Sequence, residues 1–161
     1  MRNIYQLFAL IILISCSQEE VVDMKIPTGD LEKNMLAGEI FLQANLSQSG
    51  VIEVEPGLQY LVLNEGDLQA KKPKPSDKIT AHFHGTLLDG TVFWSSVDMN
   101  DPLIIKPSQL IPGCQKILPL MRIGDKWRVF IHPDMAYGEE GRPTIPPNSV
   151  LTFEIELLAV N

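Results

Sequence analysis

The spacing of apolar residues along the chain changes near residue 50. Before that point, the stretch DLEKNMLAGEIFLQANLSQSGV places its apolar residues among polar ones at roughly helical intervals. Asp30 can cap the start of a helix, and Gly50 lies just beyond the end of the pattern. The spacing therefore predicts one short helix from about Leu31 to Ala44.

From Val54 onward, apolar and polar residues alternate in short runs, as they do in half-buried strands. GLQYLVLNEG predicts a strand at residues 58–63, and DPLIIKP predicts a short strand between prolines. KITAHFHGTLLDGTVFWSS indicates two antiparallel strands joined at Asp89-Gly90, a dipeptide that favours a tight hairpin. Two further alternating runs, DKWRVFIHP and SVLTFEIELLAV, predict the remaining strands.

One segment among these strands has a helical pattern. GCQKILPLMRIG carries clustered apolar residues and ends before Gly124, but Pro119 lacks a backbone N–H and distorts any helix that contains it. The whole pattern predicts an α+β domain, in which about five antiparallel strands pack their apolar face on one short helix.

The N-terminal residues have the pattern of an export signal. MRNIYQLFALIILISC contains one early positive charge and an apolar run that is too short to span a bilayer. LISC resembles the lipobox of bacterial lipoproteins, which implies cleavage before Cys16 and a lipid on its sulfur. The alternative is an ordinary signal peptide in which this cysteine is incidental. Ser17 favours sorting to the outer membrane under the rule that holds in proteobacteria.

These observations divide the chain into three parts. We expect a lipoprotein signal peptide at residues 1–15, a lipidated tether with the short amphipathic helix at residues 16–53, and one folded domain at residues 54–161. The chain length of 161 residues agrees with one domain and a tail.

Composition and charge exclude several functions. The formal net charge is −7, and the short cluster Lys71, Lys72 and Lys74 is interrupted by prolines, so the chain lacks the basic patch of a nucleic-acid-binding protein. If Cys16 carries lipid, Cys114 has no partner for a disulfide within one chain. Its apolar neighbours predict inert burial rather than a catalytic thiol.

A metal site is also not expected. His82 and His84 lie on one face of a predicted strand and could hold a metal ion, but no cysteine or carboxylate stands nearby in the sequence to complete a set of ligands. We therefore predict solvent-facing histidines, no metal and no cofactor.

Four motifs, in order along residues 54–161, carry a family resemblance. GLQY opens the domain, HFHGTLLDGTVFWSS is similar to the pattern HYTGxLxDGxxFDSS, LIPGCQKILPLMRIGDKWRVFIHPDMAYG is similar to VIPGWxExLxxMxxGxxxxxxIPxxxAYG, and IPPNSVLTFEIELL is similar to the last strand. Together they resemble the FKBP-type peptidyl-prolyl isomerases, in particular their bacterial Mip-like branch. The resemblance implies a bent antiparallel sheet wrapped around one helix, with an apolar pocket between them.

The resemblance also implies the residues of that pocket. Phe93 would form an apolar wall for the proline ring, and the Ile111 N–H and the Tyr137 hydroxyl would bind the substrate backbone. The other implied substrate-binding residues are Phe83, Trp94, Leu110, Cys114, Ile145 and Phe153. Without the resemblance, phenylalanines on strands such as Phe83 and Phe153 are more often plain core.

The chain departs from the family pattern at several of these positions. Trp94 replaces the aspartate of FDSS, Cys114 replaces the tryptophan of PGW, and Phe83 stands where tyrosine is usual. Met99 stands about where an arginine commonly pairs with that aspartate. One hypothesis is that the Trp94 indole fills the volume that is vacated at Cys114. The departures predict a reshaped pocket with reduced isomerase activity.

The expected function is a peptidyl-prolyl cis-trans isomerase that assists exported proteins at the cell envelope. We expect its partners to be proline-containing exported polypeptides, and the membrane through a lipid at Cys16, on the periplasmic side of the outer membrane. The alternative is a catalytically weak proline-binding or chaperone module of an envelope complex. Because the segment between Cys16 and Val51 is short for a dimerising helical region, we expect a monomer.

Overall fold

The structure is a computed structural model that describes residues 30–161 of the chain. The predicted signal peptide and the predicted lipidation site at Cys16 lie outside these residues. Within the described part, no helix is both long enough and apolar enough to cross a membrane.

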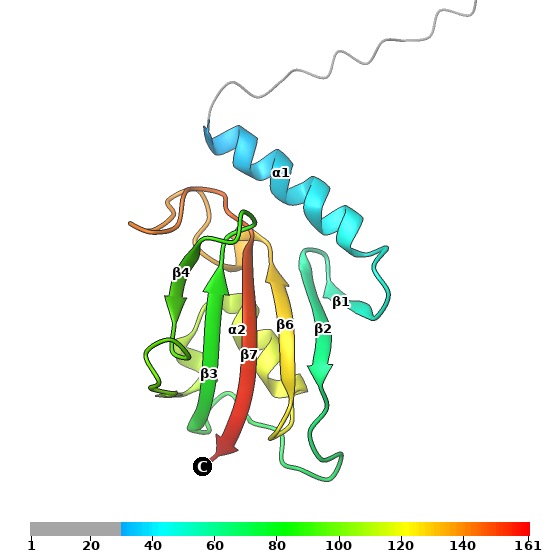
Figure 1. Ribbon diagram of the computed structural model, residues 1–161, viewed down its shortest axis with the longest axis vertical. Helices are drawn as coiled ribbons and strands as arrows, with labels where there is room; N and C mark the ends of the chain where they lie inside the picture. Colours follow the sequence, from blue (N-terminus) through cyan, green and yellow to red (C-terminus); the bar gives the residue numbers. More distant parts are fainter. Residues whose placement is uncertain (1–29) are drawn as a thin grey trace, which may run out of the picture.

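A seven-stranded antiparallel sheet forms the body of the molecule (Figure 1). Its strand order is β1-β2-β6-β7-β3-β4, and β5 pairs with β3 in line with β4. The strands are β1 (Val51–Glu55), β2 (Leu58–Asn64), β3 (Ile79–Thr86), β4 (Val92–Ser95), β5 (Leu103–Ile105), β6 (Lys126–Ile131) and β7 (Leu151–Val160). The longest pairing joins β3 to β7 at the centre, where both strands bury every second residue.

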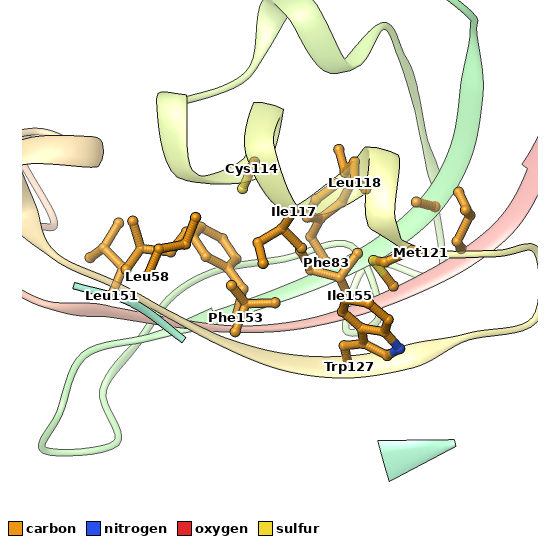
Figure 2. Close-up of a cluster of buried hydrophobic side chains, with 14 of the residues drawn as sticks. Leu58, Phe83, Cys114, Ile117, Leu118, Met121, Trp127, Leu151, Phe153 and Ile155 are labelled. Atoms are coloured by element: carbon orange, nitrogen blue, oxygen red, sulfur yellow. The ribbon is translucent and has the colours of Figure 1, made fainter. Parts of the chain in front are cut away.

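One face of the sheet packs on α2 (Pro112–Ile117) and the short 3-10 turn η2 (Leu118–Leu120) that continues it. Figure 2 shows Cys114 and Ile117 of α2 above the buried side chains of the sheet. The core cluster on this face includes Phe83, Val129 and Ile155. Burial of such apolar side chains drives folding. Pro119 sits in the first turn of η2, so the helix tightens there, as its sequence predicts.

The helix α1 (Asp30–Asn45) packs against the opposite face near one end of the sheet (Figure 1). Phe130 lies between Val129 and Ile131 on β6 and therefore points away from the core cluster. It packs with Leu42 and Val150 in a second cluster, and Phe41 adds a tilted aromatic contact to Phe130 at 5.6 Å between ring centroids.

Polar contacts fix the position of α1. Buried Asn45 donates to the Gln59 side chain at 2.9 Å, and Gln59 donates to the carbonyl of Leu42 at 3.0 Å. At the other end of the helix, Asn34 donates to the carbonyl of Pro147 at 2.9 Å. The helix is thereby attached both to β2 and to the loop that precedes β7.

The α+β class, the sheet around a helix and the N-terminal helix are confirmed, while the count of about five strands is too low. The six alternating runs named from the sequence all form strands, and the strand that none of them covers is β1. The predicted boundary at residues 53 and 54 falls inside β1. None of its residues is buried, because it is an edge strand, so its sequence carries no signal of a covered face.

Candidate functional site

Three aromatic rings from three strands meet at one end of the core cluster. Phe153 of β7 makes edge-to-face contacts with Phe83 of β3, at 6.4 Å between centroids, and with Phe93 of β4, at 5.4 Å. This geometry suits the charge distribution of aromatic rings, because the positive edge of one meets the negative face of the other. The rings therefore form a fixed apolar surface.

Gly85 permits this arrangement. It pairs with Phe153 across the β3–β7 ladder, and a Cβ atom at this position would stand 2.5 Å from Phe93 Cζ and 2.9 Å from Phe153 Cε1. Both distances are too short for carbon atoms in contact. A glycine is thus required for the two rings to close over β3.

The aromatic surface forms the inner wall of a cavity of about 550 Å³. Its lining combines the sheet, the β4 edge, the segment before α2 and the loop before β7. The residues are Phe83, Phe93, Trp94, Leu103, Gln109, Leu110, Ile111, Cys114, Tyr137, Arg142, Thr144, Ile145 and Phe153. The size is that of a site for a small ligand or a few residues of peptide.

All the pocket residues that the sequence implies lie around this one cavity, although their roles in binding stay a prediction. Four lining residues were not expected there, namely Leu103, Gln109, Arg142 and Thr144. Arg142 carried a detectable signal, because it belongs to the charged loop GEEGR that follows Tyr137. Leu103 belongs to a strand whose pairing to β3 the sequence did not reveal.

The loop from Tyr137 to Asn148 forms the outer lip of the cavity. Arg142 and Ile145 exchange backbone hydrogen bonds at 2.8 and 2.9 Å, and the Asn148 N–H donates to the carbonyl of Gly138 at 2.8 Å. Gly138 and Asn148 have positive φ angles of 53° each, a conformation that glycine and asparagine tolerate better than other residues. These bonds fix the loop that carries Tyr137 and Ile145.

Two residues that line the cavity carry hydrogen-bond donors with no partner among residues 30–161. The N–H of Ile111, the residue before α2, donates to no group in this part of the chain, and the Tyr137 hydroxyl makes no hydrogen bond there. The neighbouring Leu110 carbonyl is already held by the Gln115 side chain at 2.7 Å. An amide carbonyl that enters the cavity can therefore accept bonds from Ile111 and Tyr137.

Cys114 lies at the base of the cavity and is 2% exposed. Burial raises the pKa of its thiol to about 12, because the charged thiolate would lose its hydration. The thiol is therefore protonated at neutral pH and behaves as a small apolar group. Its burial agrees with the predicted inert role.

Trp94 stands at the open side of the cavity. Its side chain is 37% exposed, and it does not belong to the core cluster around Cys114. The exposure of Trp94 gives no support to the hypothesis that its indole fills the volume at Cys114, and that hypothesis stays a prediction. Met99 is 56% exposed in the turn after β4.

The histidines of β3 bind hydroxyl groups. His82 Nδ1 lies 3.0 Å from Ser96 Oγ, and His84 Nδ1 lies 2.9 Å from Ser95 Oγ. No cluster of three or more metal-ligating side chains occurs within residues 30–161.

The residues that line the cavity limit its chemistry. They include no carboxylate and no histidine, and their thiol is protonated. The site can desolvate an apolar group, hold a peptide carbonyl at its rim and present one guanidinium. It is thus suited to binding a peptide in a selected conformation rather than to covalent chemistry.

Comparison with known proteins gives the family. A family model described as FKBP-type peptidyl-prolyl cis-trans isomerase matches residues 69–158. The chain is 44% identical over 131 residues to the FKBP-type peptidyl-prolyl cis-trans isomerase FkpA of Aeromonas hydrophila, over 81% of this chain and 48% of that protein. It is 42% identical over 131 residues to the outer membrane protein MIP of Legionella longbeachae, over 80% of this chain and 55% of that protein.

Solved structures show the same fold. The crystal structure of FkpA from Escherichia coli matches with a TM-score of 0.77 and 36% identity, over 82% of this chain and 61% of that chain. A peptidyl-prolyl cis-trans isomerase from Pseudomonas syringae matches with a TM-score of 0.75 and 31% identity, over 84% of this chain and 99% of that chain. The chain spans about half the length of the Aeromonas hydrophila and Legionella longbeachae proteins. From these matches and the pocket geometry, the chain belongs to the FKBP-type peptidyl-prolyl cis-trans isomerases, in their Mip-like branch.

Proposed function

We propose that this protein is a peptidyl-prolyl cis-trans isomerase that acts on exported polypeptides at the cell envelope. The observation that carries the proposal is the cavity itself. An apolar hollow walled by Phe93 and Phe153 has two unengaged donors, the Ile111 N–H and the Tyr137 hydroxyl, at its rim.

The reaction requires no nucleophile, base or metal. Rotation about a peptide bond is opposed by a barrier of about 18–20 kcal/mol, because the C–N bond has partial double-bond character. The twisted amide has lost this resonance and is less dipolar than the planar form, which water stabilises. A site that removes water and binds the twisted form more tightly than the planar form therefore accelerates the rotation.

In this mechanism, Phe93 and Phe153 enclose the proline ring and exclude water from the amide. The Ile111 N–H and the Tyr137 hydroxyl bind backbone carbonyls of the substrate and hold the chain while the prolyl bond turns. Phe83, Leu110, Cys114 and Ile145 complete the apolar lining, and Trp94 of β4 contributes to the outer wall.

We also propose that the activity is reduced relative to a typical family member. Trp94 and Met99 stand where the family pattern has an aspartate and its cationic partner, so the cavity lacks the carboxylate that usually lines it. The lost acid removes one polar group that can act on the twisted amide.

Isomerisation of a neutral X-Pro peptide, followed by NMR exchange between the cis and trans forms, tests both proposals. We expect catalysis above the uncatalysed rate, with a loss of roughly tenfold or more in Phe93→Ala. Tyr137→Phe should lower kcat/KM by a smaller factor, because it removes one hydrogen bond and keeps the ring. Unchanged activity in both variants would show that the reaction occurs elsewhere. Activity of the unmodified protein equal to that of a typical relative would exclude the attenuation.

The proposed location rests on the export pattern and on the relatives. One relative is named an outer membrane protein. We propose that Cys16 carries a lipid that attaches the domain to the outer membrane on its periplasmic side. Mass spectrometry of the protein from its native membrane should show an acylated N-terminal Cys16, and a soluble Cys16→Ser variant should leave the membrane fraction.

A second candidate function is a proline-binding or chaperone module with little catalysis. The specific observation in its favour is the absence of a carboxylate from the described lining, together with an intact cavity. Titration with an X-Pro peptide separates the alternatives: binding without acceleration of the exchange supports this second function, and binding with acceleration supports the first.

A further inference from the structure

The charge of the cavity wall is opposite in sign to that of the whole chain. Arg142 is the one charged residue among those that line the cavity, as far as residues 30–161 describe it, while the chain as a whole has a formal charge of −7. Trp94 occupies the place at which the family pattern has a carboxylate, so no acid balances the guanidinium within the lining.

The Arg142 side chain is held in a defined position. Its Cζ lies 4.7 Å from the centroid of the Tyr137 ring, within the range of a cation–π contact. Its Nη1 donates to the carbonyl of Gly141 at 2.9 Å, and its backbone is fixed by the reciprocal bonds to Ile145. The planar guanidinium thus lies over the residue that is proposed to bind the substrate backbone.

The remaining donors of this guanidinium are available. Within residues 30–161, no carboxylate forms an ion pair with Arg142, although Glu139 and Glu140 precede it by only a few positions. Arg142 is itself exposed, so a ligand can reach it from solvent. A guanidinium of this kind matches the geometry of a carboxylate.

We propose that Arg142 is a specificity-determining residue that selects peptide segments with an acidic side chain next to the proline or one residue further along. The proposal rests on the proposed isomerase function, since it assigns a substrate preference to the same cavity. Its chemistry is a charge-assisted hydrogen bond between the guanidinium and an Asp or Glu carboxylate of the bound segment.

The expected size of the effect follows from exposed ion pairs. Such pairs alter an equilibrium by about two- to fivefold, because water screens the attraction and the side chains lose freedom. Because the Arg142 side chain is already held against the Tyr137 ring, it loses less conformational entropy when it binds a carboxylate. The contact is present in both the planar and the twisted forms, so it should lower KM and leave kcat nearly unchanged.

The experiment compares acetylated, amidated peptides that differ only in Glu, Gln or Lys on either side of an X-Pro bond. With the full chain and NMR exchange, we expect kcat/KM to be about two- to fivefold higher for Glu than for Gln, and lowest for Lys. The difference should arise in KM and should disappear near 1 M salt, where the screening length falls to about 3 Å. Equal values for Glu and Gln at low salt would overturn the proposal.

Variants assign the preference to one side chain. Arg142→Gln should bring the ratio of kcat/KM values for the Glu and Gln peptides close to one, Arg142→Glu should invert that ratio, and Arg142→Lys should restore part of it. Lys72→Gln removes one positive charge at an exposed site outside the cavity and should retain the full preference. If Lys72→Gln lowers the preference as much as Arg142→Gln, the effect belongs to overall charge and the proposal is wrong.

The two proposals fail differently. Catalysis of the Gln peptide with no preference for Glu leaves the isomerase function intact and excludes the role of Arg142. If no peptide is turned over, chemical-shift titration with the same peptides still measures relative affinity. Tighter binding of Glu that depends on Arg142 then supports the selectivity without the catalysis, and equal binding of Glu and Gln contradicts it.

Discussion

Single residues determine whether the cavity exists. We expect Gly85→Ala to damage it, because the added methyl group would stand 2.5 Å from Phe93 Cζ and displace a ring from the wall. Such overpacking costs about 1–3 kcal/mol of stability, and peptide isomerisation should fall with it. Urea unfolding and the exchange assay measure the two effects.

Gly90→Ala is the matched control for this substitution. Gly90 has a φ of 85° in the hairpin turn, but an added Cβ would meet no atom within 4 Å. The control should lose stability through backbone strain and keep its activity. If Gly85→Ala retains full activity, the two rings are not required for the reaction.

The thiol of Cys114 should be inert in the folded protein. Because burial raises its pKa to about 12, a Cys16→Ser variant should react with iodoacetamide at pH 8 much more slowly than the same chain in guanidinium chloride.

The raised pKa of Cys114 also makes the free energy of unfolding depend on pH. Above the ordinary thiol pKa of about 8.5, the unfolded chain loses this proton and the folded chain keeps it, so stability falls as pH rises. Cys114→Ala should show a shallower decrease between about pH 9 and 11. Rapid labelling at pH 8 without unfolding would contradict this assignment.

At the scale of elements, an ion pair between Glu154 and Arg128 links two neighbouring strands. They face each other across β6 and β7, and Arg128 Nη2 donates to Glu154 Oε1 at 2.7 Å. This bond, with Lys126 nearby, holds the pKa of Glu154 below its ordinary value. The stabilisation is therefore present at neutral pH and is lost as the pH falls through the lowered pKa.

We expect Glu154→Gln to reduce the free energy of unfolding by about 0.2–1 kcal/mol at pH 7, the range for exposed pairs. Below the lowered pKa the variant and the unmodified protein should unfold at the same urea concentration. A difference that persists at pH 2 would show that the side chain contributes through packing rather than charge.

The packing of α1 on the sheet should depend on the close contact between Gly38 and Val150. A Cβ on Gly38 would lie 2.7 Å from Val150 Cγ2, so Gly38→Leu should lift α1 from the sheet. Hydrogen exchange should then become fast in α1 and stay slow in β6 and β7, which belong to the core cluster on the other face. Ala37→Leu adds a side chain at the adjacent exposed position and should leave the exchange of α1 unchanged. Equal protection of α1 in both variants would show that the contact is not tight.

The elements were predictable where burial imposes a period. Buried β3 and β7 alternate strictly, and both were evident from sequence. In α1 the apolar spacing predicted the helix but not its buried face, because Ile40 remains 60% exposed while Gly38 is buried. The side of α1 that faces the sheet contains Gly38, and a glycine does not appear in a pattern of apolar side chains.

The candidate site was predictable for a different reason. Residues such as Phe93 and Tyr137 stand in motifs with a fixed order along the chain, and these motifs predicted which residues line the cavity. Arg142 and Leu103 reach the cavity through the loop conformation and through the pairing of β5 with β3. Such contacts between distant segments have no counterpart in local sequence.

The molecule as a whole should be a monomer. The helix α1 has 16 residues and folds back on the sheet of its own chain, where Leu42 and Asn45 are buried. These buried residues are used within the chain, so they are not available to a second copy. Sedimentation equilibrium of the detergent-free Cys16→Ser variant should give the mass of one chain at micromolar concentration. A stable dimer would show that exposed residues of α1, such as Ile40, form an interface.

Backbone hydrogen bonds within the loop hold the lip of the cavity in place without a ligand. Tyr137, Arg142, Ile145 and Asn148 keep their places through bonds within the loop, and Pro146 and Pro147 restrict the backbone further. An incoming peptide therefore does not have to organise its receptor, and the entropic penalty of docking falls mainly on the peptide. Capture of unfolded chains should accordingly be fast, and differences among them should appear in how long each one stays.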